Sequence, residues 1–137
     1  KFIAKGMGIN RLKEVNFMTI NFTELIVWQK AMDLTGEIYQ IAKRLPKEET
    51  YALSDQMRRA AVSIPSNIAE GHGRNSTKEF IQFLAIARGS VYELETQLLL
   101  CVKIKYMTES EVQNATSLLS EIAKIINSMI TKLKSRN

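Results

Sequence analysis

Apolar residues recur every three or four positions along this chain, from Phe22 nearly to the C-terminus, and no stretch alternates with a period of two. This spacing places them on one side of a helix, because an α-helix turns once every 3.6 residues. Four such segments cover about residues 23–45, 53–71, 77–104 and 109–133, and the second begins between Lys47 and Ser54. Helices of this length with short connections predict an all-α fold, an up-down-up-down antiparallel four-helix bundle.

Residues that start or interrupt helices support this division. Ser76 with Glu79, and Thr108 with Glu111, are capping-box patterns that predict the first turns of the third and fourth helices. Pro65 lies inside the second apolar segment and has no backbone N–H to donate. The second helix is therefore expected to be kinked or split near Pro65.

The chain is long enough for one compact core and too short for two domains of ordinary size, with 137 residues of which 45% are hydrophobic. Residues 22–137 are predicted to form the single four-helix-bundle domain. Residues 1–21 carry no helical or strand period and hold +3 of the net charge of +5. They are predicted to be an irregular, basic N-terminal extension.

The composition argues against catalysis and metal binding. A single cysteine and a single histidine, Cys101 and His72, cannot form a disulfide framework or a cysteine–histidine metal centre, and no nucleophile and base are suggested by the spacing. We therefore expect no catalytic residue, no metal and no cofactor. The longest apolar run, residues 98–102, is far too short to cross a bilayer, and no signal peptide is visible. A cytoplasmic protein with no membrane partner is expected.

The third helix carries more apolar residues than one core can cover. Phe83, Ile86 and Leu100 lie away from its main apolar stripe, so this helix is apolar nearly all round. In a bundle of this size every helix has a solvent side, and the surplus predicts burial against other copies of the chain. The alternative is a wide core stripe with scattered surface apolar residues, which are normal.

Polar and small residues mark further contacts between helices or subunits. Ser63, Asn67 and Glu70 lie along one face of the second helix, and they could also satisfy backbone groups freed by the proline. Gly89 stands inside the third helix, where glycine usually marks a close approach of another backbone. The residues expected at helix or subunit contacts are Ser63, Asn67, Glu70, Phe83, Ile86, Gly89, Ser90, Glu93 and Leu100.

Basic side chains are the candidates for contact with nucleic acid. Arg74 and Lys78 flank the start of the third helix, where free amides and the helix dipole favour a phosphate. Solvated surface charge is the commoner role of such residues. The candidates are Arg58, Arg59, Arg74, Lys78 and Arg88.

Several stretches of the chain form a recognisable set. They are Val27-Trp28-Gln29-Lys30-Ala31, residues 53–56 and 58–61, Ser63-Ile64-Pro65-Ser66-Asn67-Ile68-Ala69-Glu70-Gly71 with Arg74, Ala87-Arg88-Gly89-Ser90, and Glu93-Leu94-Glu95. The stretch that begins at Ser63 and the one that begins at Ala87, at this distance from each other, are highly specific. Together these stretches resemble a known family, the 23S rRNA intervening-sequence proteins, and the similarity covers roughly residues 22–133.

The resemblance implies a bacterial four-helix bundle that assembles into a ring of five. The accessory protein of diversity-generating retroelements is similar to this family; it is a pentameric bundle that binds nucleic acid and a reverse transcriptase. That relative is markedly basic, whereas residues 22–137 of this chain carry only +2.

Two functions follow as hypotheses. The first is a non-enzymatic homo-oligomer, a pentamer by the resemblance, that serves as an RNA- or DNA-binding accessory. The second is a protein-interaction scaffold that binds a protein partner and no nucleic acid, which the low net charge favours.

Overall fold

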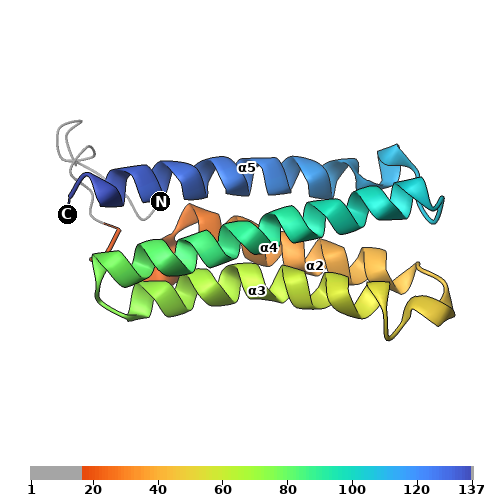
Figure 1. Cartoon of the computed structure of the whole chain (residues 1–137), viewed down its shortest axis with the longest axis horizontal. Coiled ribbons are helices and arrows are strands. Elements are labelled where there is room, and N and C mark those ends of the chain that lie inside the picture. The colour runs from red at the N-terminus through yellow and green to blue at the C-terminus, as the bar shows by residue number, and fades with distance from the viewer. Residues whose placement is uncertain (1–16, 137) are drawn as a thin grey trace.

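The computed structural model describes residues 17–136, and within them it contains four long α-helices, two short 3-10 helices and no strand. The elements are η1 (Phe22–Glu24), α2 (Ile26–Lys43), η2 (Lys47–Glu49), α3 (Leu53–Gly73), α4 (Thr77–Lys103) and α5 (Glu109–Lys134). The predicted all-α fold with four helices is confirmed. Figure 1 shows the connections at alternating ends of the molecule, so consecutive helices run in opposite directions.

Each long helix packs against two others, in the order α2, α3, α4, α5 and back to α2. Helices α2 and α4 therefore lie diagonally across the bundle, as do α3 and α5. The residues of the predicted apolar seams form one continuous core along the axis. The largest side chains that are fully buried in it are Phe80, Leu34, Ile38, Ile41, Met57, Ile64, Ile68, Leu84, Leu94, Leu98, Leu119 and Ile122.

The packed part of the chain begins before residue 22. Phe17, Met18 and Ile20 are half-buried against the core, and His72 Nε2 lies 2.9 Å from the Phe17 carbonyl oxygen. The segment just before the first helices is thus held to the bundle by apolar contact and a hydrogen bond. The rest of the predicted extension, residues 1–16, lies outside the described residues.

Helix α3 continues through Pro65 without a break, so of the predicted kink or split the split does not occur, and the kink stays a prediction. Proline at this position leaves the Ala61 carbonyl without its usual donor. The Thr35 hydroxyl on α2 lies 3.1 Å from that oxygen, and 2.8 Å from the Ala31 carbonyl of its own helix. The single hydroxyl hydrogen of Thr35 is thus shared between the two carbonyls, and it offers the Ala61 oxygen part of what the proline removes.

The two predicted capping boxes differ in the structure. At Thr108 the box is complete, because its hydroxyl accepts from Glu111 N and the Glu111 carboxylate accepts from Thr108 N. At Ser76 only one half forms: Ser76 Oγ accepts from Glu79 N at 3.2 Å. The Glu79 carboxylate instead lies 3.7 Å from Arg74 Nη1. The Glu79 side chain thus forms an ion pair with Arg74 in place of the second hydrogen bond of the capping box.

Candidate functional site

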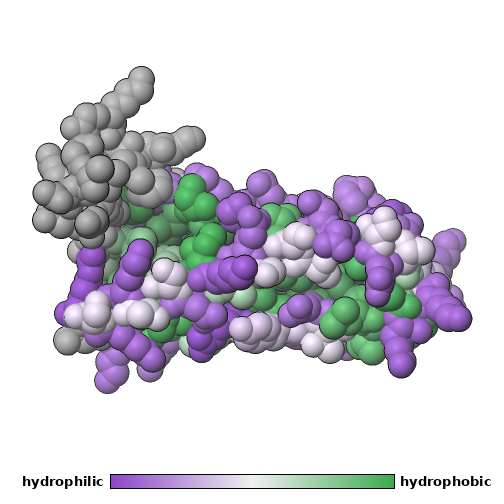
Figure 2. Space-filling view, turned by 90° about the horizontal axis from the view of Figure 1, so that it is seen from above, coloured by the Kyte–Doolittle hydropathy of each residue, from purple (hydrophilic) through white to green (hydrophobic). Residues whose placement is uncertain are grey.

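The outward side of α4 carries several large apolar side chains from Ile86 onward. Ile86, Tyr92, Leu99, Leu100 and Ile104 are all more than two-fifths exposed, with Leu99 reaching 58%. We call these five side chains the α4 face. The predicted contact residues Ile86 and Leu100 belong to it. In Figure 2 hydrophobic residues come to the surface in separate areas among hydrophilic ones, so polar side chains alone do not cover the molecule.

Polar side chains join α3 and α4 beside this face. The hydroxyls of Ser63 and Ser90 are 2.8 Å apart, and the Asn67 amide donates to the carbonyl and the hydroxyl of Ser63. Gln97 is buried; its amide nitrogen lies 3.4 Å from a Glu93 carboxylate oxygen, and its Oε1 has no hydrogen-bond partner among the described residues. Four of the predicted contact residues thus lie in or beside one α3–α4 junction.

Two glycines, Gly89 on α4 and Gly71 on α3, differ in how closely another helix approaches them. A Cβ atom built on Gly89 meets nothing within 4 Å, so no other part of the described chain approaches this glycine. At Gly71 such an atom would overlap the Phe83 Cβ atom and lie 3.2 Å from Phe80 Cδ1. Close approach of α3 to α4 within the chain therefore depends on Gly71. Phe83, another predicted contact residue, packs on that glycine.

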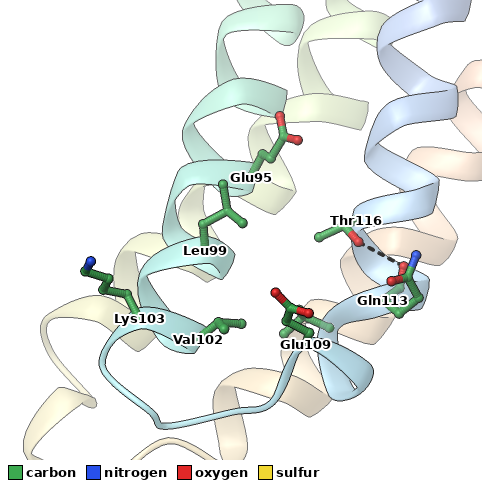
Figure 3. A pocket seen from close by; sticks show the side chains of 8 residues that line it. Glu95, Leu99, Val102, Lys103, Glu109, Gln113 and Thr116 are labelled. Carbon is green, nitrogen blue, oxygen red and sulfur yellow. Dashed lines mark hydrogen bonds between the residues drawn. The ribbon is translucent and has the colours of Figure 1, made fainter.

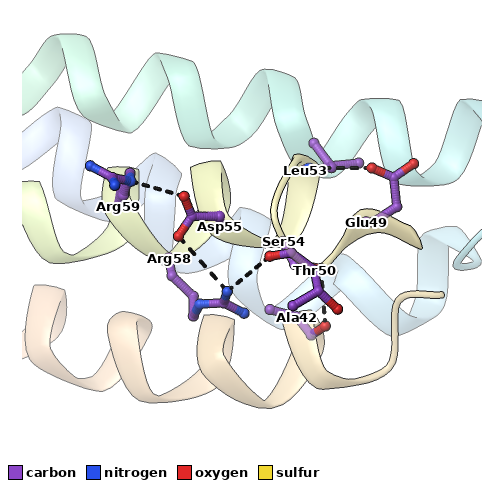
Figure 4. Close-up of polar contacts among 8 residues, drawn as sticks. All are labelled: Ala42, Glu49, Thr50, Leu53, Ser54, Asp55, Arg58 and Arg59. Carbon is purple, nitrogen blue, oxygen red and sulfur yellow. Dashed lines mark hydrogen bonds and ion pairs between the residues drawn. The ribbon is translucent and has the colours of Figure 1, made fainter. Parts of the chain in front are cut away.

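Arg58 and Arg59, on adjacent positions of α3, share one carboxylate (Figure 4). Arg59 Nε donates to Asp55 Oδ2 at 3.0 Å, and Arg58 Nη2 lies 3.9 Å from Asp55 Oδ1. Arg58 Nη2 also donates to the Thr50 carbonyl. The side chain of Arg59 is 78% exposed, whereas that of Arg58 is 27% exposed. Two guanidinium groups against one carboxylate leave this place positively charged.

Arg74 lies at the other end of α3, where its charge is neutralised. Its Nη2 atom donates to Glu70 Oε2 at 3.0 Å, and its Nη1 atom is near Glu79. The guanidinium also stacks 5.2 Å above the Phe83 ring. Lys78 is exposed in the first turn of α4 nearby. Two cations and two carboxylates therefore give this end no net charge.

Arg88 is in a third place, on the side of α4 that faces α5, where its Nη1 atom donates to Asn127 Oδ1 at 2.8 Å. The structure therefore brings Arg58 together with Arg59, and Arg74 together with Lys78. It does not gather the five predicted cations into one basic surface on a single chain.

A pocket opens between α4 and α5 near their connection (Figure 3). It measures about 440 Å³ and is lined by Glu95, Leu99, Val102, Lys103, Glu109, Val112, Gln113 and Thr116. The hydroxyl of Thr116 donates to the Gln113 carbonyl. The lining of the pocket combines apolar side chains with two carboxylates and one lysine.

At the same end of the bundle, Glu49 links the connection after α4 to the start of α3 through two hydrogen bonds. One of its carboxylate oxygens accepts from the Tyr106 hydroxyl at 2.8 Å, and the other accepts from Leu53 N at the start of α3. The hydrogen bond to Glu49 raises the pKa of Tyr106 above its usual value. Cys101 is buried in the core, which raises the pKa of its thiol, and its sulfur contacts Met57.

No group of three or more His, Cys, Asp or Glu side chains in residues 17–136 is placed to hold a metal ion. Among the helices of this part, none combines the length and the apolar character needed to cross a bilayer.

Comparison with known proteins identifies the family of this chain. The model of the 23S rRNA-intervening sequence protein family matches residues 23–128, well over half of the chain. The chain belongs to this family. Comparison with curated proteins gives no match.

One solved structure extends this family relation to the fold. It is a protein of unknown function from the S23 ribosomal protein family of Bacteroides thetaiotaomicron VPI-5482. That protein is 29% identical, with a TM-score of 0.72, and the match covers 77% of this chain and 98% of that one. The core of the family thus corresponds to the bundle, while the segment before residue 23 lies outside the family match.

The structure adds three functional candidates that the sequence analysis missed. Asp55 could have been found, because it stands three and four positions before Arg58 and Arg59, the spacing of ion pairs on a helix. Tyr39 and Thr35 face α3 from α2, and no local pattern indicates which residues of two different helices meet.

Proposed function

We propose that this member of the family is a non-enzymatic bundle that assembles with copies of itself through the α4 face and serves as an RNA- or DNA-binding accessory. The observation that carries the first part is the contrast between α4 and α5. From Ile86 to Ile104, only two of the exposed residues of α4 are charged. On α5, every exposed residue is polar.

The contrast matters because both helices have the same task inside the bundle. Each contributes one apolar seam to the core, and α5 shows that a polar outer surface is compatible with that task. The α4 face extends over 19 residues, from Ile86 to Ile104, or about 27 Å along the helix axis. Burying such side chains against a second copy removes apolar area from water at roughly 25 cal/mol per Å². Exposed large apolar side chains gathered on one side of a helix are typical of a protein interface.

Size-exclusion chromatography with light scattering tests the assembly. We expect a mass several times the 15.6 kDa of one chain, and five times if the ring implied by the resemblance forms. The double variant Ile86→Glu/Leu100→Glu should shift towards one copy, because charge on the interface is costly to bury. Ser117→Glu on the polar face of α5 is the matched control and should keep the mass of the wild type. A wild-type protein of one copy at micromolar concentration contradicts the proposal.

For the nucleic-acid role, the basic side chains proposed to contact phosphate are Arg58, Arg59, Arg74, Lys78 and Arg88. Affinity for RNA should fall steeply as salt rises, because bound cations release counterions from the phosphates. A gel-shift titration against total RNA, run beside Arg58→Ala/Arg59→Ala, measures this. Binding that is indifferent to salt between low and physiological ionic strength contradicts it.

A second candidate is the protein-interaction scaffold that binds no nucleic acid. The ion pairs of Arg74 with Glu70 and Glu79 favour it, because they leave that end of α3 without net charge. In this case neither the wild type nor the arginine variant shifts RNA in the gel, while the assembly is unchanged.

A further inference from the structure

A second pocket lies between α2 and α3. It measures about 510 Å³ and is lined by Tyr39, Asp55, Arg58, Arg59, Val62, Ser63 and Ser66. Arg58 and Arg59, the two predicted phosphate contacts that share the Asp55 carboxylate, therefore border this pocket.

The charge of this α2–α3 pocket favours an anion. Asp55 is the only carboxylate among its lining residues, and it faces two guanidinium groups. Arg59 uses Nε for Asp55, and its Nη1 and Nη2 atoms have no hydrogen-bond partner in residues 17–136. Lys43 is exposed one helical turn beyond Tyr39 on α2, which adds positive charge on the same side. Arginine N–H groups in this position suit the oxygens of a phosphate.

The apolar side of the pocket suits a base. Tyr39 and Val62 lie on facing helices and are each 40% exposed, so both present apolar surface to the pocket. Aromatic rings beside cations are the means by which proteins bind single-stranded nucleic acid, with bases stacked on the rings and phosphates on the arginines. Ser66 places a further hydroxyl in the same pocket.

We propose that the α2–α3 pocket binds one nucleotide of a single-stranded nucleic acid, with its phosphate on Arg58 and Arg59 and its base against Tyr39. This inference rests on the nucleic-acid role proposed above and assigns it to one place. Asp55 occupies the guanidinium groups in the free protein and competes with the phosphate.

Fluorescence polarisation with a labelled twelve-nucleotide oligo-uridine tests the proposal on the full chain. Arg59→Ala should weaken binding about tenfold, since a hydrogen bond between charged groups is lost. It should also lower the slope of log affinity against log salt by about 0.7, one phosphate of a single strand. Tyr39→Ala should weaken binding at least about fivefold, and Tyr39→Phe should restore it, because the ring is retained.

Asp55→Asn gives the sharpest result, because it should bind more tightly than the wild type, about threefold or more, once the competing charge is removed. Arg44→Ala is the matched control: this exposed arginine also pairs with one carboxylate, Glu111, on the opposite side of α2. Its affinity should stay within about twofold of the wild type. Uridine monophosphate should compete at the same pocket far better than inorganic phosphate, since only the nucleotide carries a base. Thermal melts of every variant confirm that the bundle is folded.

The outcomes separate this inference from the proposed function. If the wild type binds the oligonucleotide while Arg59→Ala and Tyr39→Ala bind equally well, the pocket assignment is overturned and the nucleic-acid role stands. If Asp55→Asn weakens binding, Asp55 does not compete with phosphate and the assignment is likewise overturned. If the folded wild type binds no RNA or DNA at low salt, both fall.

Discussion

Replacing Gly71 with alanine places one methyl group where α3 and α4 touch. The new Cβ would overlap the Phe83 Cβ and lie 3.1 Å from its Cγ and 3.2 Å from Phe80 Cδ1. The Phe83 Cβ is attached to the α4 backbone and cannot swing away as the end of a long side chain would. Either α4 or the start of its connection must therefore move.

The size of the effect follows from two opposing terms. Overpacking of a tight contact costs about 1–3 kcal/mol. Alanine in place of a helical glycine returns up to about 1 kcal/mol, and less in the last turn of α3, where Gly71 lies. We expect a net loss of about 1–2 kcal/mol in the free energy of unfolding, or about 4–8 °C in Tm for a chain of this length.

Urea unfolding followed by circular dichroism, at one fixed protein concentration, measures this loss as a lower midpoint with an unchanged slope. Gly36→Ala is the matched control, because Gly36 lies inside α2, is exposed and has no neighbour within 4 Å of a built Cβ. That variant should gain about 0.5–1 kcal/mol. If Gly71→Ala is as stable as Gly36→Ala, the close approach of Phe83 does not determine the packing of α3 on α4.

Three further predictions concern single side chains. Thr35→Val should lower the free energy of unfolding by about 1–2 kcal/mol, since the Ala61 carbonyl loses its donor. In a Pro65→Ala background, which restores the backbone donor, the same substitution should change the urea midpoint less. An equal loss in both backgrounds would refute this account. The N-cap hydrogen bond lowers the pKa of Glu111 below its usual 4.5, so its stabilisation is present above that value and is lost as pH falls through the folded-state pKa. Melting from pH 6 to 3 should therefore show a smaller acid loss for Glu111→Gln than for the wild type, and parallel curves would contradict it. Gly89→Ala should gain about 1 kcal/mol if nothing covers Gly89, whereas a loss that grows with protein concentration shows that another copy packs there.

The fold could be predicted from the sequence because its determinants are local. The seam from Phe80 to Cys101 repeats at helical spacing, and every one of its predicted members is buried. The complete box at Thr108 likewise needs only residues four positions apart or closer. Such patterns state which side of each helix faces inward. They do not state which residues of two helices meet.

Pro65 shows what is lost without that information. The sequence indicates a missing donor and therefore a kink or a break in the helix, and α3 stays unbroken with the Thr35 hydroxyl of the neighbouring helix 3.1 Å from the Ala61 carbonyl oxygen. The same limit applies to glycine, since Gly71 and Gly89 both lie within helices. Only the position of Phe83 decides which of the two requires the absence of a side chain.

The candidate sites divide along the same line. The α4 face could be predicted, because the sequence of this helix alone shows that it has more apolar residues than one core can cover. The α2–α3 pocket could not, because Tyr39 is separated from Arg59 by a helix end, a connection and a helix start. In the sequence Arg74 and Lys78, at the start of the third helix, have the most specific reason to bind phosphate, and carboxylate neighbours change this order: Asp55 faces two guanidinium groups, whereas Arg74 faces two carboxylates. A net charge of +2 over the bundle is therefore compatible with a local excess of positive charge, and phosphate recognition depends on that local excess and not on the sum.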